Sequence, residues 1–443
     1  MVMQAVKSEF SLTSLSLSGL FFKSAIRNQI MLLTPYRVLD LTGPLGFLTG
    51  KIFGDLGADV IKIERPGGEP SRRQPPFLNN GNGCHQSLSW LAHNTNKRGI
   101  TLNLEDEKGR ELFYRLAAES DFIIESFPPG SRRELGLAYD ELSRQNPGLI
   151  LVSISPFGQE GPYKDLQGSD LEIMALSGAM SLAGEKDGEP MRVSVPQAPM
   201  WVGAEAAMGA LTALAYRSMT GLGQHVDVSA QVAVMSALAH APAFWDLNRV
   251  NPERAGVFVT GRSVLGAKMR VMWPCKDGWI NFIIYGGAAG RHTNQQLMAW
   301  MTEKGLASEG LKEIDWNTFA VTNIAQSEVD RLEAPIAGFF AAVTKDEFLE
   351  GAINRQMLGY PVATVADIDR NPQLQARNFW QDVMGGGSGK SLKYPGGFAV
   401  VNGQRLQIRR AAPCVGEHNA EVYGAELGLN ESEIAEFQAD GVI

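Results

Sequence analysis

The chain is poor in the residues that build disulfide frameworks and metal centres. It has only three cysteines, Cys84, Cys275 and Cys414, and six histidines. The cysteines are far apart and form no C-x-x-C pair, and the histidines form no H-E-x-x-H, so neither a disulfide framework nor a zinc site is predicted. We therefore expect metal-free chemistry in a reducing, cytoplasmic compartment.

Long basic runs and long apolar runs are also missing. The formal net charge is -8, and no basic stripe with interleaved aromatic residues marks a nucleic-acid surface. No apolar run reaches the ~20 residues that cross a bilayer. With 443 residues, of which 44% are hydrophobic, the chain is long enough for several domains. It is expected to be globular and to bind neither nucleic acid nor membrane.

Residues 1–35 differ in composition from the rest of the chain. Ser and Leu recur through residues 10–18, and Glu9 is the only acid of this segment. The apolar part is too short for a membrane span and carries no convincing cleavage site. We expect an extension outside the folded core, with a targeting peptide as the alternative and Met31 as a candidate start.

The stretch 38–73 contains a strand, a turn, a helix and a second strand in immediate succession. The short apolar run 38–41 and the β-branched run 60–63 predict two parallel strands. Between them, apolar residues at 48–56 follow helical spacing, and Gly57 stands where a helix ends. A unit of this kind predicts a ligand near the carboxyl ends of its strands.

The loops of this unit favour phosphate over a dinucleotide. The glycines at 43–50 read G-x-x-G-x-x-x-G, whereas dinucleotide-binding folds carry G-x-G-x-x-G. After the second strand come Arg65, Arg72 and Arg73, whose guanidinium groups are suited to phosphate. A solvated charged loop fits these arginines equally well.

Further strands and helices alternate along the chain. The fold class is therefore α/β with a doubly wound sheet, since several of the strands end in polar or glycine-rich loops. From about residue 244 to 360 short strands give way to charge-rich helices, which indicates a smaller inserted domain. Strands are predicted at 98–104, 122–127, 149–155 and 225–229, and helices at 109–118 and 201–217.

Five short motifs occur in a fixed order between residues 55 and 418. They are D-L-G-A-D-V-I-K-I-E-R at 55–65, N-K-R-G at 96–99, L-S-G at 176–178, T-G-L-G-Q-H-V-D-V-S at 220–229 and V-G-E-H at 415–418. In this order they resemble the class III CoA-transferases, also called the CaiB/BaiF or formyl-CoA transferase family. The resemblance covers about residues 36 to 443.

The resemblance implies a Rossmann-like large domain built from both chain ends, a smaller inserted α+β domain and an interlocked dimer. On this chain the large domain would comprise 36–230 and 361–443. The small domain would comprise 244–345, with a linker on either side, and 1–35 would remain an extension.

The resemblance also implies covalent catalysis by an aspartate. In this family the aspartate takes the acyl group from an acyl-CoA as an anhydride and then holds CoA as a thioester until an acceptor carboxylate collects it. The CoA thioester is thus a substrate, and no permanently bound cofactor is expected.

The family's aspartate lies just before the small-residue helix, in a pattern like G-D-x-x-x-G. Here the segment 195–203 contains no acid, so the resemblance implies no catalytic residue on this chain. Two other carboxylates of the chain are candidate substitutes for the nucleophilic aspartate. Asp187 matches a family Asp-Gly that is not the nucleophile and reads as a turn. Asp170 matches a family acid beside the active site and also reads as a cap for the helix that follows it.

Four residues match family positions in the CoA cleft. Arg65 corresponds to an arginine that meets the CoA nucleotide, and Leu102, Phe127 and Phe157 correspond to positions that line the cleft.

Other positions depart from the family pattern. Ser126 stands where Asn is usual, Glu105 replaces a lysine, and 133–134 inverts an acid-then-Arg order. The turn 42–46 is one residue shorter than in formyl-CoA transferases and lacks their active-site glutamine. These departures predict weakened or lost CoA binding.

The chain has the family motifs but lacks the nucleophile and part of the CoA-binding pattern. We therefore expect it to be one subunit of a heteromeric transferase whose aspartate lies on a paralogous partner. Benzylsuccinate-type transferases, which use succinyl-CoA and an aryl-succinate, are similar to this arrangement. The alternatives are a self-sufficient transferase using Asp170 or Asp187, an acyl-CoA racemase of the same fold, and a CoA-binding protein without activity. The racemases carry Gly-His-Asp where this chain has Gly-Ser-Asp at 168–170.

Overall fold

The computed structural model describes residues 31–78, 87–384 and 391–443. Residues 1–30, most of the expected extension 1–35, lie outside the described residues. Leu33 is buried, and its backbone N–H donates to the carbonyl oxygen of Leu56 at 3.0 Å. At least this part of the expected extension 1–35 therefore packs with the core.

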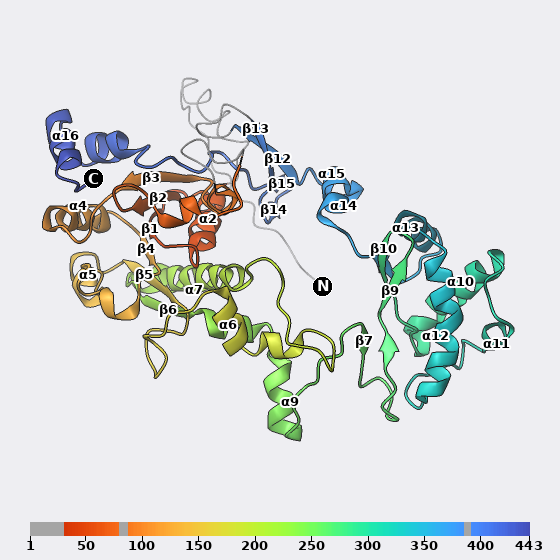
Figure 1. Cartoon of the computed structure of the whole chain (residues 1–443). Helices are drawn as coiled ribbons and strands as arrows, with labels where there is room; N and C mark the ends of the chain where they lie inside the picture. Colours follow the sequence, from red (N-terminus) through yellow and green to blue (C-terminus); the bar gives the residue numbers. More distant parts are fainter. Residues whose placement is uncertain (1–30, 79–86, 385–390) are drawn as a thin grey trace, which may run out of the picture.

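A parallel sheet forms the centre of the larger part of the molecule (Figure 1). Its strands lie in the spatial order β3-β2-β1-β4-β5-β6, and every neighbouring pair is parallel. This is the strand order of a doubly wound Rossmann-type sheet, so the α/β prediction is confirmed. The strands are β1 (Arg37–Leu41), β2 (Asp59–Glu64), β3 (Lys97–Thr101), β4 (Phe122–Glu125), β5 (Ile150–Ser155) and β6 (His225–Ser229).

Both faces of the sheet are covered because successive side chains of a strand point to opposite faces. Val38 and Ile124 pack in one buried cluster with α2, α6, α7 and α8. Leu39 and Ile123 pack in the other with α4, α5 and the end of the chain. The helices are α2 (Phe47–Asp55), α4 (Glu107–Ala118), α5 (Tyr139–Gln145), α6 (Asp170–Leu176), α7 (Ala198–Thr220) and α8 (Ala230–Ser236).

The end of the chain returns to the edge strand β3, where α16 (Glu431–Ala439) lies beside α4 in Figure 1. The buried Tyr423 donates its hydroxyl to the carbonyl oxygen of Thr101 at 2.7 Å, and Asn419 Oδ1 accepts the Thr101 N–H at 2.9 Å. The backbone N–H of Gly99 donates to His418 Nδ1 at 3.0 Å. Residues from both halves of the sequence therefore share the core around the sheet.

The middle of the chain has its own buried cluster, at the opposite side of Figure 1 from β3. An antiparallel sheet in the order β11-β10-β9 packs against helices through Trp273, Trp300 and Phe340. The domain bounds 36–230 with 361–443, and 244–345, stay predictions. The elements of this part are β9 (Met272–Cys275), β10 (Gly278–Asn281), β11 (Tyr360–Pro361), α10 (Gly287–Glu303), α11 (Glu309–Lys312), α12 (Gln326–Ala341) and α13 (Lys345–Asn354).

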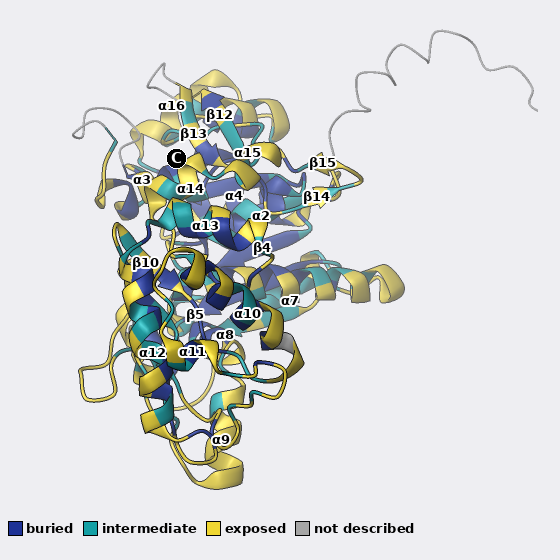
Figure 2. Cartoon of the chain, turned by 90° about the vertical axis from the view of Figure 1, so that its right-hand side faces the viewer, coloured by how far each residue is buried: buried dark blue, intermediate teal, exposed yellow. Residues whose placement is uncertain are grey.

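Short elements join these parts. Helix α9 has no buried residue, and Figure 2 shows it exposed, as is much of α7. The connecting elements are α3 (Leu88–His93), α9 (His240–Asn248), β7 (Phe258–Val259), β8 (Met269–Arg270), α14 (Val365–Arg370), α15 (Pro372–Ala376), β12 (Trp380–Met384), β13 (Ser391–Pro395), β14 (Val400–Val401) and β15 (Gln404–Arg405).

The two described cysteines differ in state. Cys275 is free, whereas Cys414 is disulfide-bonded. One disulfide is not a disulfide framework, but the cysteine spacing did not predict it. The cytoplasmic location stays a prediction. Within the described part of the chain, no helix is both long enough and apolar enough to span a membrane.

Candidate functional site

A cavity of about 780 Å³ opens at the carboxyl edge of the parallel sheet. Leu41 and Glu64 end β1 and β2 there, while Leu102 directly follows β3 and Phe127 lies just beyond the end of β4. The strand order reverses between β1 and β4, whose connections leave to opposite faces and open a crevice. The cavity therefore lies where a doubly wound sheet binds its ligand.

Three of the four residues that were matched to the CoA cleft line this one cavity, namely Arg65, Leu102 and Phe127. Phe157 follows β5 and is not among the lining residues; its ring packs near Gly168 instead. Arg110 is the second cation of the lining, and its Nη1 donates to the carbonyl oxygens of 104–105 at 3.0 Å each. The lining thus combines two guanidinium groups, which suit phosphate, with apolar walls. It also carries Glu64, whose charge Arg72 neutralises, and the carboxylates of Glu69, Glu105 and Glu134, which disfavour an anion near them.

The three arginines that follow β2 have different roles. Arg72 is buried, and its Nε and Nη2 donate to both carboxylate oxygens of Glu64 at 2.6 Å each. Its guanidinium lies 3.6 Å from the centre of the Trp90 ring. Arg73 is exposed and donates to the carbonyl oxygen of Gly67 at 3.2 Å. Arg65 is the one of the three that lines the cavity, so Arg72 holds the loop and is no phosphate ligand.

A buried charge network lies beneath the turn that joins β1 to α2. Lys97 Nζ donates to Asp40 Oδ2 at 2.8 Å, and Lys62 Nζ donates to the carbonyl oxygen of Thr42 at 2.5 Å. All three ionisable side chains are at most 1% exposed. Burial lowers the pKa of Lys97 to about 8, although the Asp40 carboxylate opposes this shift. Gly43 N–H donates to Ser126 Oγ at 2.7 Å, which ties the turn to the end of β4.

The first turn of α7, where the resemblance places the nucleophile, is capped by Asp170. Its Oδ1 accepts the backbone N–H groups of Gln197 and Ala198 at 2.6 and 2.8 Å. Among the described residues, Oδ2 has no hydrogen bond. The sequence analysis expected Asp170 to cap the helix that follows it, but Ser169 caps α6 through a capping box with Glu172. Asp170 instead places a carboxylate at the start of α7.

Asp187 lies apart from this region. It belongs to an exposed turn beside a separate cavity of about 200 Å³, whose lining shares no residue with the carboxyl-edge cavity. Arg254 donates to the carbonyl oxygen of Gly188 at 2.7 Å and so fixes the turn. The turn interpretation of Asp187 agrees with this geometry.

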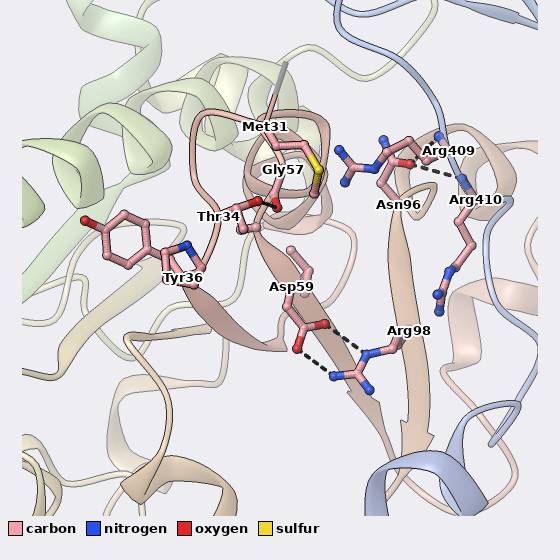
Figure 3. Close-up of a pocket in the computed structure, with 12 residues that line it drawn as sticks. Met31, Thr34, Tyr36, Gly57, Asp59, Asn96, Arg98, Arg409 and Arg410 are labelled. Carbon is pink, nitrogen blue, oxygen red and sulfur yellow. Dashed lines mark hydrogen bonds and ion pairs between the residues drawn. The ribbon is translucent and has the colours of Figure 1, made fainter. Parts of the chain in front are cut away.

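A further cavity of about 330 Å³ lies at the opposite, amino edge of the same strands (Figure 3). Asp59 begins β2 and accepts from Arg98 Nε and Nη2 at 2.9 and 2.6 Å. Arg409 and Arg410 also line this cavity, and their backbone N–H groups both donate to Asn96 Oδ1. Ligands of doubly wound sheets bind at the carboxyl edge, so we assign the candidate site to the larger cavity.

The sequence analysis missed Glu125, the last residue of β4, and treated it only as part of a strand. Its carboxylate is completely buried, and burial raises its pKa to about 7. A lone acid at the end of an otherwise apolar strand is the signal that could have identified it. Within the described part of the chain, no group of three or more His, Cys, Asp or Glu side chains could hold a metal ion.

Comparisons with known proteins show which family the chain belongs to. Over 402 residues the chain is 36% identical to the succinyl-CoA:(R)-benzylsuccinate CoA-transferase subunit BbsE of Thauera aromatica, covering 90% of this chain and 95% of that protein. It is 28% identical over 395 residues to the succinyl-CoA–L-malate CoA-transferase beta subunit of Chloroflexus aurantiacus, covering 88% of this chain and 93% of that one.

Among solved structures, a CAIB/BAIF family protein from Brucella suis superposes with a TM-score of 0.74 at 28% identity, covering 90% of this chain and 100% of that chain. Residues 33–419 match the family described as CoA-transferase family III. Proteins of this family use CoA thioesters as substrates. The chain therefore belongs to CoA-transferase family III and is a transferase of class III.

Proposed function

We propose that this chain is one subunit of a heteromeric CoA-transferase that moves CoA from succinyl-CoA to a carboxylic acid such as an aryl-succinate. The observation that carries the proposal is the absence of any acid between Glu189 and Glu205, the segment that begins α7. The nucleophilic aspartate would then belong to a paralogous partner. Two of the relatives, the benzylsuccinate and malate transferases described above, are named as subunits of CoA-transferases that use succinyl-CoA, which supports this arrangement.

The carboxyl-edge cavity is the proposed CoA site. Arg65 would bind phosphate of the CoA nucleotide through charge-assisted hydrogen bonds, with Leu102 and Phe127 as apolar contacts. Phe157 remains a proposed contact from the neighbouring loop after β5. This site binds and orients the thioester, while the partner's carboxylate attacks the acyl carbon and the CoA thiolate leaves.

Exposed apolar side chains support an assembly with a second subunit of the same fold, in the interlocked form that the family resemblance implies. Met208 and Met219 of α7 are 60% and 79% exposed, and Leu247 of α9 is 79% exposed. Figure 2 shows α7 projecting from the body of the chain. Exposed apolar surface over long helices is typical of protein interfaces.

A second candidate function is favoured by Asp170. Its carboxylate lies at the start of α7, and its Oδ2 has no hydrogen bond within the described residues, so this oxygen would be available to attack a thioester. In that case the chain would transfer CoA without a partner's aspartate. The two hydrogen bonds to Oδ1 and the positive end of the α7 dipole stabilise the carboxylate and so lower its nucleophilicity. We therefore keep this function second.

The deciding experiment is a CoA-transfer assay with succinyl-CoA and a panel of carboxylic acids. The chain is tested alone and after co-expression with its nearest paralogue, each as wild type and as Asp170→Asn. The proposal expects activity in the mixture only, with Asp170→Asn within a few-fold of wild type. Asp187→Asn serves as the matched control, because it removes an exposed carboxylate outside the cavity.

Activity of the chain alone that Asp170→Asn abolishes with an intact fold would replace the heteromeric proposal by the second function. Activity of the chain alone that survives Asp170→Asn would contradict both functions.

A further inference from the structure

Glu125 contacts the segment that forms one wall of the candidate CoA cavity. It ends β4, faces Ser153 of β5 in the sheet register, and is 0% exposed. Its Oε2 accepts the backbone N–H of Phe127 at 2.7 Å. Phe127 lines the cavity, so a buried carboxylate holds the first residue of this wall.

Arg132 faces the other oxygen of the same carboxylate without reaching it. Its Nε lies 4.0 Å from Glu125 Oε1, and within the described residues neither of these buried atoms has a hydrogen-bond partner. A hydrogen bond between them needs an approach of about 1 Å. The two side chains form an ion pair at this distance, but these two buried atoms lack a hydrogen bond, which is costly, and one charge-assisted hydrogen bond between them would satisfy both.

The guanidinium is held at its other end by the neighbouring strands. Arg132 Nη1 donates to Ser153 Oγ and contacts His225 Nε2, both at 3.2 Å. Burial and the Arg132 charge lower the pKa of His225, which disfavours a second cation beside Arg132. Tyr139 of α5 stacks on this imidazole.

Burial, two hydrogen-bonding groups and two charges act on Glu125. Burial raises its pKa most, and Asp227 of β6 raises it further. Ser153, the Phe127 N–H and Arg132 lower it. The carboxyl group therefore changes charge near neutral pH while its Arg132 partner lies slightly out of reach.

Phe127, which donates to Glu125, and Arg132, which pairs with it, both belong to the segment 127–135. Phe127 and four further residues of this segment line the cavity, namely Pro128, Ser131, Glu134 and Leu135. We propose that Glu125 and Arg132 are a positioning pair for acyl-CoA binding: when the pair closes, it sets this wall of the cavity against the bound thioester. The inference rests on the proposed function in one respect, that CoA occupies this cavity.

The pair couples CoA binding to proton release. Closing requires ionised Glu125, and the nearby guanidinium then holds the carboxylate in its charged form. Binding of CoA below pH 7 therefore expels a proton from Glu125, and affinity rises with pH until the carboxylate is already ionised in the free protein.

The test is calorimetric titration of the purified, assembled enzyme with CoA between pH 5.5 and 8.5, in buffers of different ionisation enthalpy. The phosphate monoester of CoA also titrates near pH 6, so its share of the proton release is common to all variants and the difference between variants reports Glu125. Wild type should release about one proton more than Glu125→Gln near pH 6 and should gain about tenfold more affinity by pH 8. Glu125→Gln should bind more weakly than wild type at pH 8, by about tenfold. Glu125→Asp, which restores the charge, should recover proton release in part.

Glu141→Gln is the matched control. It removes the exposed carboxylate that lies 3.3 Å from Arg133, the neighbour of Arg132, and should leave affinity and proton release unchanged. If Glu125→Gln fails to fold, Arg132→Met replaces it. That variant should raise the pKa of Glu125 and weaken CoA binding at pH 8. Glu125→Gln or Arg132→Met that folds and titrates like wild type would overturn the positioning pair.

Failure of the CoA site itself is distinguishable from failure of the pair. Wild type that binds no CoA at any pH would overturn the proposed function at this cavity. The pair would then be read from amide hydrogen exchange at Phe127, which should slow as pH rises through 7 after correction for intrinsic exchange. Exchange that is independent of Glu125 ionisation would overturn the pair as well.

Discussion

Replacing Arg72 by Met is expected to destabilise the fold without removing a CoA contact. The variant leaves Glu64 with a buried charge, because the two guanidinium hydrogen bonds to its carboxylate, at 2.6 Å each, are lost. The side chains of Arg72 and Glu64 are 7% and 0% exposed, so solvent does not screen the loss. Breaking a buried ion pair by removing one partner costs about 3–5 kcal/mol.

Replacing Arg65 by Met should have the opposite effect. Arg65 is exposed and lines the cavity, so its loss should change the free energy of unfolding by less than about 0.5 kcal/mol. Loss of one charge-assisted contact to phosphate should weaken CoA binding by about 1.5–3 kcal/mol. Although the two arginines are close in sequence, replacing Arg72 should therefore lower mainly the stability of the fold, whereas replacing Arg65 should lower mainly the affinity for CoA.

Urea unfolding of each purified variant measures the stability, and calorimetric titration of CoA into the assembled enzyme measures the affinity. The double variant Glu64→Gln with Arg72→Met should recover part of the lost stability, because no unpaired charge stays buried. The reasoning is refuted if Arg72→Met unfolds at the wild-type urea concentration and loses CoA affinity about tenfold. Arg72 would then be the phosphate ligand, and the Glu64 pair would contribute little.

Three further predictions concern stability. Asp170→Ala should lower the free energy of unfolding, measured in urea, by about 1 kcal/mol, because the first amides of α7 lose their cap. Asp170→Asn should lower it less, because Asn is also a good cap. Equal unfolding curves for Asp170→Ala and wild type would contradict this. Gly50→Ala should cost more than about 2 kcal/mol, since the new Cβ would lie 2.2 Å from Oδ2 of the buried aspartate of β1. Gly338→Ala, inside α12 with nothing within 4 Å of its Cβ, should stabilise by about 0.5–1 kcal/mol; the reverse order would refute the steric argument. Glu125 has its pKa raised from 4.5 to about 7 in the fold, so its contribution to stability is complete below pH 4.5 and is lost as pH rises to 7. Glu125→Gln should flatten this part of the stability profile, measured by urea unfolding at pH 4.5, 6 and 7.5.

The sheet could be predicted from the sequence because its strands are buried on both faces. Runs such as 60–63 and 149–155 are mostly apolar, with Lys62, Ser153 and Ser155 as the exceptions, and they end in proline or polar residues. The rule that parallel connections are right-handed and do not cross limits the possible strand orders but does not select the observed one. The carboxyl-edge position of the site follows from the same topology.

The roles of single charged residues could not be predicted, because long-range contacts decide them. Arg72 Nη2 donates at 2.9 Å to the carbonyl oxygen of Pro413, and its guanidinium stacks on Trp90. No residue close to Arg72 in the sequence indicates these partners. The sequence therefore predicted the same phosphate-binding role for Arg72 as for Arg65. The prediction for Asp170 was wrong for the same reason. Asp170 follows Ser169 at the start of α6 and was expected to cap that helix, but it caps α7.

The chain keeps a cavity with a cation in its lining but lacks the nucleophilic aspartate. This combination favours an enzyme in which one subunit binds CoA and the other carries out the covalent chemistry. Arg65 and Phe127 still line a cavity of about 780 Å³, although no acid stands in the segment that begins α7. A chain that had lost both binding and chemistry would have no reason to keep a cation beside this cavity. A chain that still carried out the chemistry alone would need a carboxylate freer than that of Asp170, whose Oδ1 is engaged by two backbone amides. Binding here and covalent chemistry on the partner satisfy both conditions, and this division is what the Asp170→Asn comparison tests.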